Sequence, residues 1–193
     1  MSKKAENNAP EEEINWLKEI VGMVVYVAFV VLAVWLIITF VGQRTEVSGS
    51  SMYDTLENGD NLWVSKISYH LHDPERFDIV VFPHMEEDGE SKYYIKRIIG
   101  MPGETVRIDE EGTIYINDKV LEEDYGYETI STSMIGRAWE NVVLGDDEYF
   151  VMGDNRNDSL DSRTEEVGNI KREELEGKAV FRIWPFSKFG KIE

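Results

Sequence analysis

The sequence predicts an all-β domain of barrel-like antiparallel sheets that follows one N-terminal transmembrane helix. Two observations carry this prediction. One uninterrupted apolar run occupies residues 20–43, and short β-branched or aromatic runs separated by turn signals fill much of the remainder. The charge balance, 20 Lys+Arg against 38 Asp+Glu, excludes a general nucleic-acid binder, because such a protein needs a basic surface.

Residues 20–43 contain no charged side chain. At about 1.5 Å per residue such a helix spans roughly 36 Å, enough for a hydrocarbon core of roughly 30 Å. A cleaved secretory signal is the alternative. Its apolar core would be shorter and would end at a small-x-small site, which residues 39–43 do not offer. We therefore expect an uncleaved anchor in the lipid bilayer, preceded by a short tail at 1–19.

Positive charges flank this helix unequally. Lys3, Lys4 and Lys18 precede it, whereas Arg44 alone follows within the next 20 residues. Loops on the cytoplasmic side carry the excess of Lys and Arg. The sequence therefore predicts a single-pass protein of the cell membrane, with a cytoplasmic N-terminus and an extracytoplasmic domain at 44–193.

The domain at 44–193 contains runs typical of strands. Pro83 is expected to end the strand at 77–82. Residues 85–92 predict a hairpin tip, and residues 171–175 predict a short helix. Residues 122–147 are mixed in polarity and predict an insertion over the sheet rather than part of the core. Strands are expected at 61–65, 77–82, 93–99, 105–109, 113–117, 149–152 and 179–184.

Several kinds of chemistry are excluded or disfavoured by composition. The chain has no cysteine, which excludes disulfides, thiolate metal sites and a cysteine nucleophile. Its histidines are His70, His72 and His84, too few for an ordinary zinc site. No P-loop and no G-x-G-x-x-G motif is present. We therefore expect neither a metal nor an organic cofactor.

The first segment with function-capable residues is 48–56, Ser-Gly-Ser-Ser-Met-Tyr-Asp-Thr-Leu. A serine on a Gly-containing turn can expose its hydroxyl and offer a backbone N–H to an oxyanion. A polar linker is the simpler interpretation of such a stretch. The local pattern does not distinguish Ser48, Ser50 and Ser51 as nucleophiles.

The second segment is the apolar strand 93–99, which contains Lys96 and Arg97. Neighbouring residues of a strand point to opposite faces, so we expect one of these cations to be partly buried. Burial lowers the pKa of a lysine, and a neutral lysine can act as a general base. Two cations that extend to solvent from a sheet rim are the alternative.

The third segment is 153–163, Gly-Asp-Asn-Arg-Asn-Asp-Ser-Leu-Asp-Ser-Arg, directly after a strand. It lacks the residue order of an EF-hand loop. Its two arginines can pair with its own carboxylates, so a self-contained turn network is the alternative to a functional loop.

Taken in order, the anchor, these segments and the runs R-x-D-I-V-V-F (76–82) and Y-Y-I-K-R-I-I-G-x-P-G-E (93–104) resemble the type I signal peptidases. The resemblance extends from residue 20 to the end and is greatest to the short, single-anchor members from Gram-positive bacteria. It implies a membrane-bound serine endopeptidase that cleaves N-terminal signal peptides from exported preproteins.

The resemblance also assigns roles to residues. It implies that Ser51 is the nucleophile, that Lys96 is the general base and that Ser159 orients the lysine. Asp161 and Arg163 would shape the site, and Asp154 would pair with Arg97. The substrate would lie extended along strand edges, with binding residues Met52, Asp78, Ile79, Val80, Val81 and Tyr94.

Two positions depart from the family pattern. Asp54 stands where proline is usual, and we expect its carboxylate to point away from Lys96 and to cap the turn by accepting a backbone N–H. Gly49 stands where some members have a serine that donates to the oxyanion, which leaves the second donor unassigned.

Two other functions stay open at this level. A non-catalytic pilus-assembly or chaperone-like relative could share the fold, although the presence of Ser51, Lys96 and Ser159 argues against it. A peptidase dedicated to one precursor would share the chemistry. The sequence predicts neither preferred substrates nor an oligomeric state.

Overall fold

The computed structural model describes residues 16–37, 41–86 and 88–192. It divides into two compact units, 1–38 and 39–193. The first unit contains helix α1, Trp16–Leu36, which is long and apolar enough to span a membrane. Its 21 residues extend about 32 Å at about 1.5 Å each.

The apolar helix is displaced from the predicted span of 20–43. It begins at Trp16 and ends at Leu36, and Gly42 already belongs to strand β1, Gly42–Glu46. The strand packs too closely on β2 for a side chain at Gly42, where a Cβ atom would lie 2.4 Å from the Val64 carbonyl oxygen. The uncharged run at 20–43 therefore extends into strand β1, and the bounds of a membrane span within the run stay a prediction. Of the predicted tail at 1–19, residues 1–15 lie outside the described residues.

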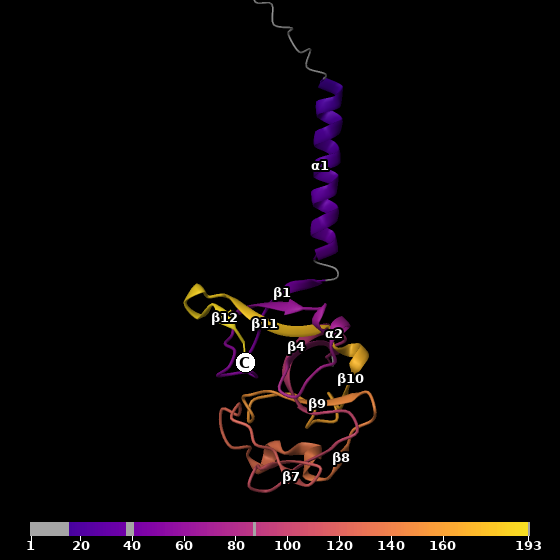
Figure 1. Ribbon diagram of the computed structural model, residues 1–193. Helices are drawn as coiled ribbons and strands as arrows, with labels where there is room; N and C mark the ends of the chain where they lie inside the picture. Colours follow the sequence, from indigo (N-terminus) through magenta and orange to yellow (C-terminus); the bar gives the residue numbers. More distant parts are fainter. Residues whose placement is uncertain (1–15, 38–40, 87, 193) are drawn as a thin grey trace, which may run out of the picture. The chain divides into compact units, whose positions relative to one another are not determined.

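The second unit consists of two antiparallel sheets and confirms the predicted all-β class. The larger sheet has the order β1-β2-β11-β3-β4-β9-β10, with β12 paired to β11, and the smaller has the order β7-β6-β5-β8. Within this unit, β1, β11 and β12 lie at one end and β7 and β8 at the other (Figure 1).

The remaining strands are β2 Asn61–Ser65, β3 Ile79–Met85, β4 Ser91–Gly100, β5 Thr105–Ile108, β6 Ile114–Ile116, β7 Lys119–Val120, β8 Val142–Val143, β9 Glu148–Met152, β10 Ile170–Lys171, β11 Gly177–Trp184 and β12 Gly190–Lys191. The short helices are α2 Ser68–Leu71 and the 3-10 turns Thr132–Met134, Gly136–Trp139, Arg172–Glu174 and Phe186–Lys188.

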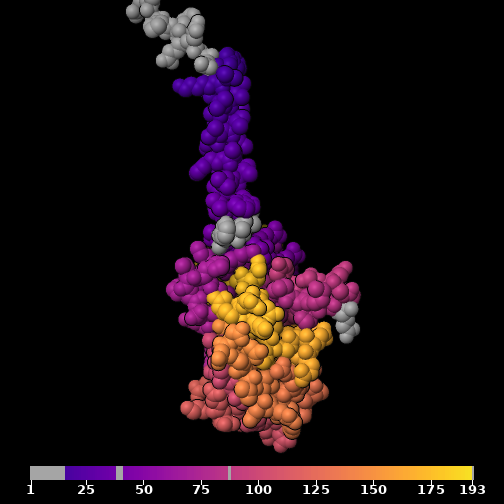
Figure 2. Space-filling view, turned by 90° about the vertical axis from the view of Figure 1, so that its right-hand side faces the viewer, coloured from indigo at the N-terminus to yellow at the C-terminus, as the bar shows by residue number. Residues whose placement is uncertain are grey.

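The predicted end of β3 at Pro83 is wrong. The strand continues to Met85 and pairs with β4 from Ile79 to Met85, with Pro83 opposite Tyr93. Strand β11 pairs with β3 only at Val80 and Val81. Beyond these positions β3 has one neighbour, and an edge strand tolerates a residue without an N–H. The hairpin tip predicted at 85–92 closes this pair, and the hairpin protrudes from one side of the domain (Figure 2).

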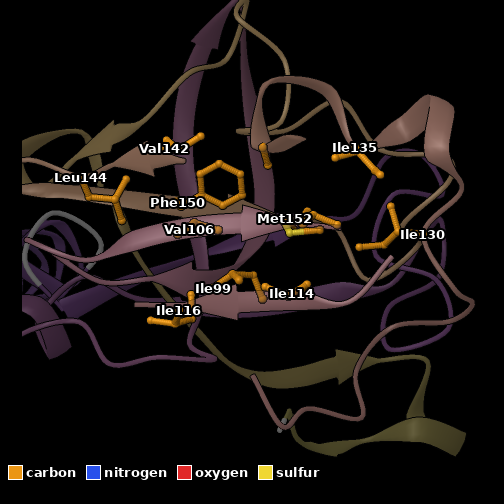
Figure 3. Packing of buried hydrophobic residues seen from close by; sticks show 12 residues of the cluster. Ile99, Val106, Ile114, Ile116, Ile130, Ile135, Val142, Leu144, Phe150 and Met152 are labelled. Carbon is orange, nitrogen blue, oxygen red and sulfur yellow. The ribbon is translucent and has the colours of Figure 1, made fainter. Parts of the chain in front are cut away.

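The prediction that 122–147 lies outside the core is also wrong. Ile130, Ile135, Ala138, Val142 and Leu144 are buried in the cluster between the smaller sheet and β9. Their side chains surround Phe150 and Met152 (Figure 3). These apolar residues are spaced irregularly in a polar segment, because loops, two 3-10 turns and the two-residue strand β8 follow one another there. The short helix predicted at 171–175 is likewise one 3-10 turn.

Candidate active site

Ser51 lies on the turn that follows β1. The turn is closed by the Tyr53 N–H, which donates to the Ser50 carbonyl at 3.0 Å, and by the Leu56 N–H, which donates to the Met52 carbonyl at 2.8 Å. Met52 and Leu56 are buried in the core beneath it, with exposed fractions of 2% and 0%. Burial of these two side chains leaves the Ser51 hydroxyl facing a cavity.

Lys96 lies on β4 opposite Val80, and its Nζ is 2.7 Å from the Ser51 Oγ. Its side chain is buried among apolar strand residues, with 4% of the residue exposed. Burial lowers the pKa of Lys96 from 10.5 to about 8; the Arg163 charge adds to this effect, and Asp161 and Asp154 oppose it. A lysine that loses its proton near pH 8 can accept one from a hydroxyl at hydrogen-bond distance.

Arg97 occupies the opposite face of β4 and is fully buried. Its Nε and Nη2 donate to the two carboxylate oxygens of Asp154 at 2.9 and 2.8 Å, and its Nη1 donates to the Phe77 carbonyl at 2.9 Å. Thr55 donates its hydroxyl to the same carboxylate at 2.6 Å. The structure therefore contains the Asp154–Arg97 pair that the resemblance implies, and Thr55 ties that pair to the nucleophile turn.

Asp161 and Arg163 form a second buried ion pair. Two guanidinium nitrogens of Arg163 each donate to Asp161 at 2.8 Å, and Nη1 donates to the Met134 carbonyl at 2.9 Å. Burial opposes ionisation of Asp161, but hydrogen bonds and charge from Arg163 outweigh it and hold the pKa of Asp161 below 3.8. The Gly153 N–H also donates to Asp161 at 3.0 Å, so this pair shapes the loop beside Ser51.

Ser159 is buried next to the nucleophile turn, but its hydroxyl makes no hydrogen bond to Lys96 in this structure. Gly153 separates the two serines: a Cβ at Gly153 would lie 2.3 Å from both the Ser159 Oγ and the Ser51 carbonyl oxygen. Within the described residues the Ser159 Oγ has no partner of normal geometry, although it lies near enough to Asp161 to help lower the pKa of that group. The lysine-orienting contact is therefore not formed here.

A cavity of about 570 Å³ opens beside Ser51 and Lys96. Met52 and Tyr94, two of the predicted binding residues, line it. Its walls are two chain segments and a loop, contributing Thr45, Glu46, Val47, Ser48, Gly49, Ser50, Ser51 and Met52 from the first, Glu86, Lys92, Tyr93, Tyr94, Ile95 and Lys96 from the second, and Asp158 and Leu160 from the loop.

Asp78, Ile79, Val80 and Val81 do not line this cavity, and their role in substrate binding stays a prediction. Val80 and Val81 pair with β4 on one side and β11 on the other, which leaves no free edge. Ile79, Val80 and Val81 are buried, and Asp78 pairs with Lys178. A β-branched run does not by itself reveal whether a strand is central or at an edge.

Two free strand edges flank the cavity instead. Among the described residues, strand β1 pairs with β2 alone, and Val47 directs both its N–H and its carbonyl toward the β2 side. By alternation, the backbone groups of Glu46 and Ser48 face away from β2. Strand β4 pairs with β9 only from Arg97 onward, so Tyr93 and Ile95 keep backbone groups free on that side. An extended peptide between these edges can form main-chain hydrogen bonds.

The Ser51 N–H has no hydrogen-bond partner among the described residues and is therefore available to an oxyanion. Gly49 has φ +100° and donates its N–H to the Asn58 side chain at 2.9 Å. Ser50, which sequence reasoning did not single out, donates its hydroxyl to Asp158 at 2.5 Å. The second oxyanion donor therefore stays unassigned.

Asp54 is exposed and does not contribute to the electrostatics of Lys96. This position agrees with the expectation that it points away from the lysine. The expected cap is not formed: among the residues that the structure describes, none donates a hydrogen bond to the Asp54 carboxylate.

No group of three or more histidine, aspartate or glutamate side chains within 16–37, 41–86 and 88–192 is arranged to hold a metal ion.

Sequence reasoning missed the contribution of 123–131 to this region. Tyr125 lies over the Arg97 guanidinium, 3.7 Å from its ring centroid, and Glu123 pairs with Arg156 at 2.6 and 2.7 Å. The one available signal was the aromatic content of an otherwise acidic stretch, which does not by itself indicate a contact 28 residues away.

Comparison with known proteins identifies the family of the chain. The family model described as signal peptidase, peptidase S26, matches residues 10–184. The "Probable signal peptidase I-2" of Synechocystis sp. is 40% identical over 192 residues, covering 98% of this chain and 81% of that protein. The "Signal peptidase I" of Bacillus licheniformis is 33% identical over 199 residues and covers the whole of both chains.

Among solved structures, a signal peptidase I from Enterococcus faecalis V583 is 33% identical, covers 55% of this chain and 97% of its own, and has a TM-score of 0.44. The family model and the full-length relatives lead to one conclusion. The chain belongs to the signal peptidase family, peptidase S26.

Proposed function

We propose that this chain is a membrane-anchored serine endopeptidase that removes N-terminal signal peptides from exported preproteins. The observation that carries the proposal is the 2.7 Å approach of the Lys96 Nζ to the Ser51 Oγ, with burial lowering the pKa of that lysine to about 8. Full-length relatives named as signal peptidase I supply the substrate class.

The reaction begins with neutral Lys96. Its Nζ accepts the Ser51 hydroxyl proton while the Oγ attacks the scissile carbonyl carbon, and the Ser51 N–H stabilises the oxyanion. The ammonium of Lys96 then gives this proton to the leaving amine as the C–N bond breaks. Water then attacks the resulting ester while Lys96 takes one of its protons. As the ester bond breaks, Lys96 returns that proton to the Ser51 Oγ, which restores the serine and releases the signal peptide.

The substrate lies extended between the free edges of β1 and β4. Glu46 and Ser48 on one side, and Tyr93 and Ile95 on the other, offer main-chain groups to a peptide whose scissile bond faces Ser51. This position replaces the β3 edge as the binding strand. Recognition through main-chain groups suits substrates that vary in sequence, since each peptide presents the same N–H and carbonyl groups.

Helix α1 anchors the chain in the cell membrane. Lys3, Lys4 and Lys18 favour a cytoplasmic N-terminus, and the catalytic domain then lies on the extracytoplasmic side, where exported preproteins emerge. Cysteine scanning with a membrane-impermeant thiol reagent tests this orientation: a cysteine introduced at exposed Lys119 should react in intact cells. Reaction only after lysis would reverse the orientation.

Cleavage of a labelled preprotein by the detergent-solubilised chain tests the activity. The wild type should cut after a small residue, whereas Ser51→Ala and Lys96→Ala should not. Ser133→Ala and Lys119→Ala, both exposed and outside the cavity, are matched controls that should cleave normally.

The pattern of failure is informative. Failure of a folded wild type on several preproteins would contradict the proposal and favour a non-catalytic assembly role. Cleavage of a single preprotein from a broad set would restrict it to a dedicated peptidase.

A further inference from the structure

The 123–131 segment contacts the loop at 153–158 repeatedly, although it lies outside the catalytic cavity. The Tyr127 N–H donates to the Asp154 carbonyl at 2.9 Å, and the Ser131 N–H donates to the Asn157 side chain at 2.8 Å. Asn157 in turn donates to the Thr129 carbonyl at 2.9 Å. Two side chains of the segment add contacts, Glu123 to Arg156 in the loop and Tyr125 to Arg97 on β4.

The first is Glu123, whose carboxylate receives two hydrogen bonds from Arg156 at 2.6 and 2.7 Å. Arg156 is 2% exposed, and its Nε donates to the Gly153 carbonyl at 3.1 Å. Glu123 therefore neutralises a buried cation that holds the backbone of the loop. Without that carboxylate, the guanidinium would be buried unpaired or would turn toward water.

The second is Tyr125, which covers Arg97. Its ring centroid is 3.7 Å from the guanidinium carbon, and Phe77 packs beside it with a ring-centroid distance of 5.1 Å. Aromatic faces stabilise a cation most when water is excluded, and this guanidinium is fully buried. Tyr125 thus closes the Arg97–Asp154 pair from the face of β4 opposite Lys96.

The 153–158 loop passes these restraints to the nucleophile. The Asn155 N–H donates to the Ser51 carbonyl at 3.0 Å, and its side chain donates to the Ser50 carbonyl at 3.2 Å. Asp158 accepts the Ser50 hydroxyl at 2.5 Å. Arg97 directly follows Lys96 on β4. The segment therefore contacts Ser51 through the 153–158 loop and Lys96 through Arg97.

We propose that the 123–131 segment is a positioning element of the active site, in which Tyr125 and Glu123 hold Ser51 and Lys96 in reactive geometry through Arg97 and the 153–158 loop. This inference rests on the proposed peptidase function. Tyr125 lines a different cavity, together with Lys178 and Lys191, and is not among the residues that line the cavity beside Ser51. The segment lies within the insertion predicted at 122–147, and in this proposal it holds the catalytic residues in position.

The experiment compares wild type, Tyr125→Phe and Tyr125→Ala in the detergent-solubilised full chain. Tyr125→Ala should lower kcat about tenfold and leave KM within about twofold, because small misplacements of reacting groups are costly while the binding edges are untouched. Tyr125→Phe keeps the aromatic face and should restore kcat. Tyr115→Ala is the matched control, since Tyr115 covers Arg107 at 4.3 Å on the smaller sheet.

A second readout does not depend on turnover. Acetylation of Lys96 across a pH series, followed by peptide mass spectrometry, reports the pKa of this amine directly. Loosening the loop admits water, so the pKa of Lys96 should rise above about 8 in Tyr125→Ala and stay unchanged in Tyr115→Ala. A residue that only stabilises the fold would lower the unfolding midpoint and leave both kcat and this pKa unchanged below it.

Wild-type kcat together with a wild-type labelling profile in Tyr125→Ala would overturn the inference. If that variant does not fold, Glu123→Gln takes its place with the same two criteria. A wild type that cleaves nothing, but whose Lys96 profile shifts on substitution of Tyr125, would contradict the peptidase function while supporting the positioning role. If the wild type cleaves normally and Tyr125→Ala changes neither kcat nor the Lys96 labelling profile, the peptidase function is supported and the positioning role is contradicted.

Discussion

The two faces of strand β4 provide different partners for two neighbouring buried cations. Lys96 faces the cavity, is 4% exposed and forms no ion pair with any residue that the structure describes. Arg97 faces the other way, is fully buried and meets both oxygens of Asp154. Burial without a paired carboxylate lowers the pKa of the lysine, whereas Asp154 neutralises the buried charge of the arginine. The difference produces a base on one face and a structural ion pair on the other.

Lys96→Arg should have the largest effect on activity of the substitutions on these two faces. The substitution keeps a cation at the position but removes its ability to lose a proton, because the guanidinium stays charged at any workable pH. We expect kcat/KM for a preprotein to fall by about 10³-fold or more. Substantial activity in a folded Lys96→Arg chain would show that proton transfer to residue 96 is not required.

Asp154→Asn should show what the opposite face depends on. The amide cannot neutralise Arg97, so a buried charge is left without its partner and the free energy of unfolding should fall by about 3–5 kcal/mol. Denaturant unfolding of the detergent-solubilised chain measures this loss. Asp158→Asn, at an exposed hydrogen bond, is the control and should cost far less. Equal losses in the two variants would mean that the buried pair has no special weight.

The pH dependence of catalysis should reflect the protonation of Lys96. Only neutral Lys96 accepts the serine proton, and its pKa is about 8. The value of kcat/KM should therefore fall about tenfold per unit as pH drops below 8, and should level off above it. A profile centred near pH 4–5 would instead implicate a carboxylate.

Lys96→Met should stabilise the domain at neutral pH, since it removes a buried amine without leaving a large void. The lysine has a pKa of about 8 when folded and 10.5 ordinarily, so between these values the unfolded chain binds more protons. Wild-type stability then rises with pH across this window and is lowest below it. At pH 7 we expect the variant to gain about 1–3 kcal/mol in unfolding free energy, a gain that shrinks toward pH 10.5.

Asp54→Pro should have the smallest effect. The carboxylate is exposed and has no described hydrogen-bond donor, and it does not influence Lys96. We expect cleavage within about twofold of wild type, because neither reacting group loses a contact. A severe loss in a folded variant would assign Asp54 a role in the nucleophile turn.

Much of the fold follows from local pattern. Strand β2 lies at the predicted 61–65, and β4, β5, β6, β9 and β11 overlap their predicted runs, because alternation and turn residues specify strands locally. Local pattern is not enough where tertiary context decides. The apolar run did not show that Gly42 belongs to a strand, and a β-branched run did not show that β3 is central. The irregular apolar residues of 122–147 have no local period.

Composition, period and residue order are enough to predict an apolar N-terminal helix, an all-β domain and a motif set that includes Ser51, Lys96, Asp154 and Arg97. Three features follow only from the folded chain: which strand edges are free, that the Ser159 hydroxyl does not contact Lys96, and that Tyr125 covers Arg97. Each of these joins residues distant in the chain, and a contact of that kind depends on how sheets and loops pack together.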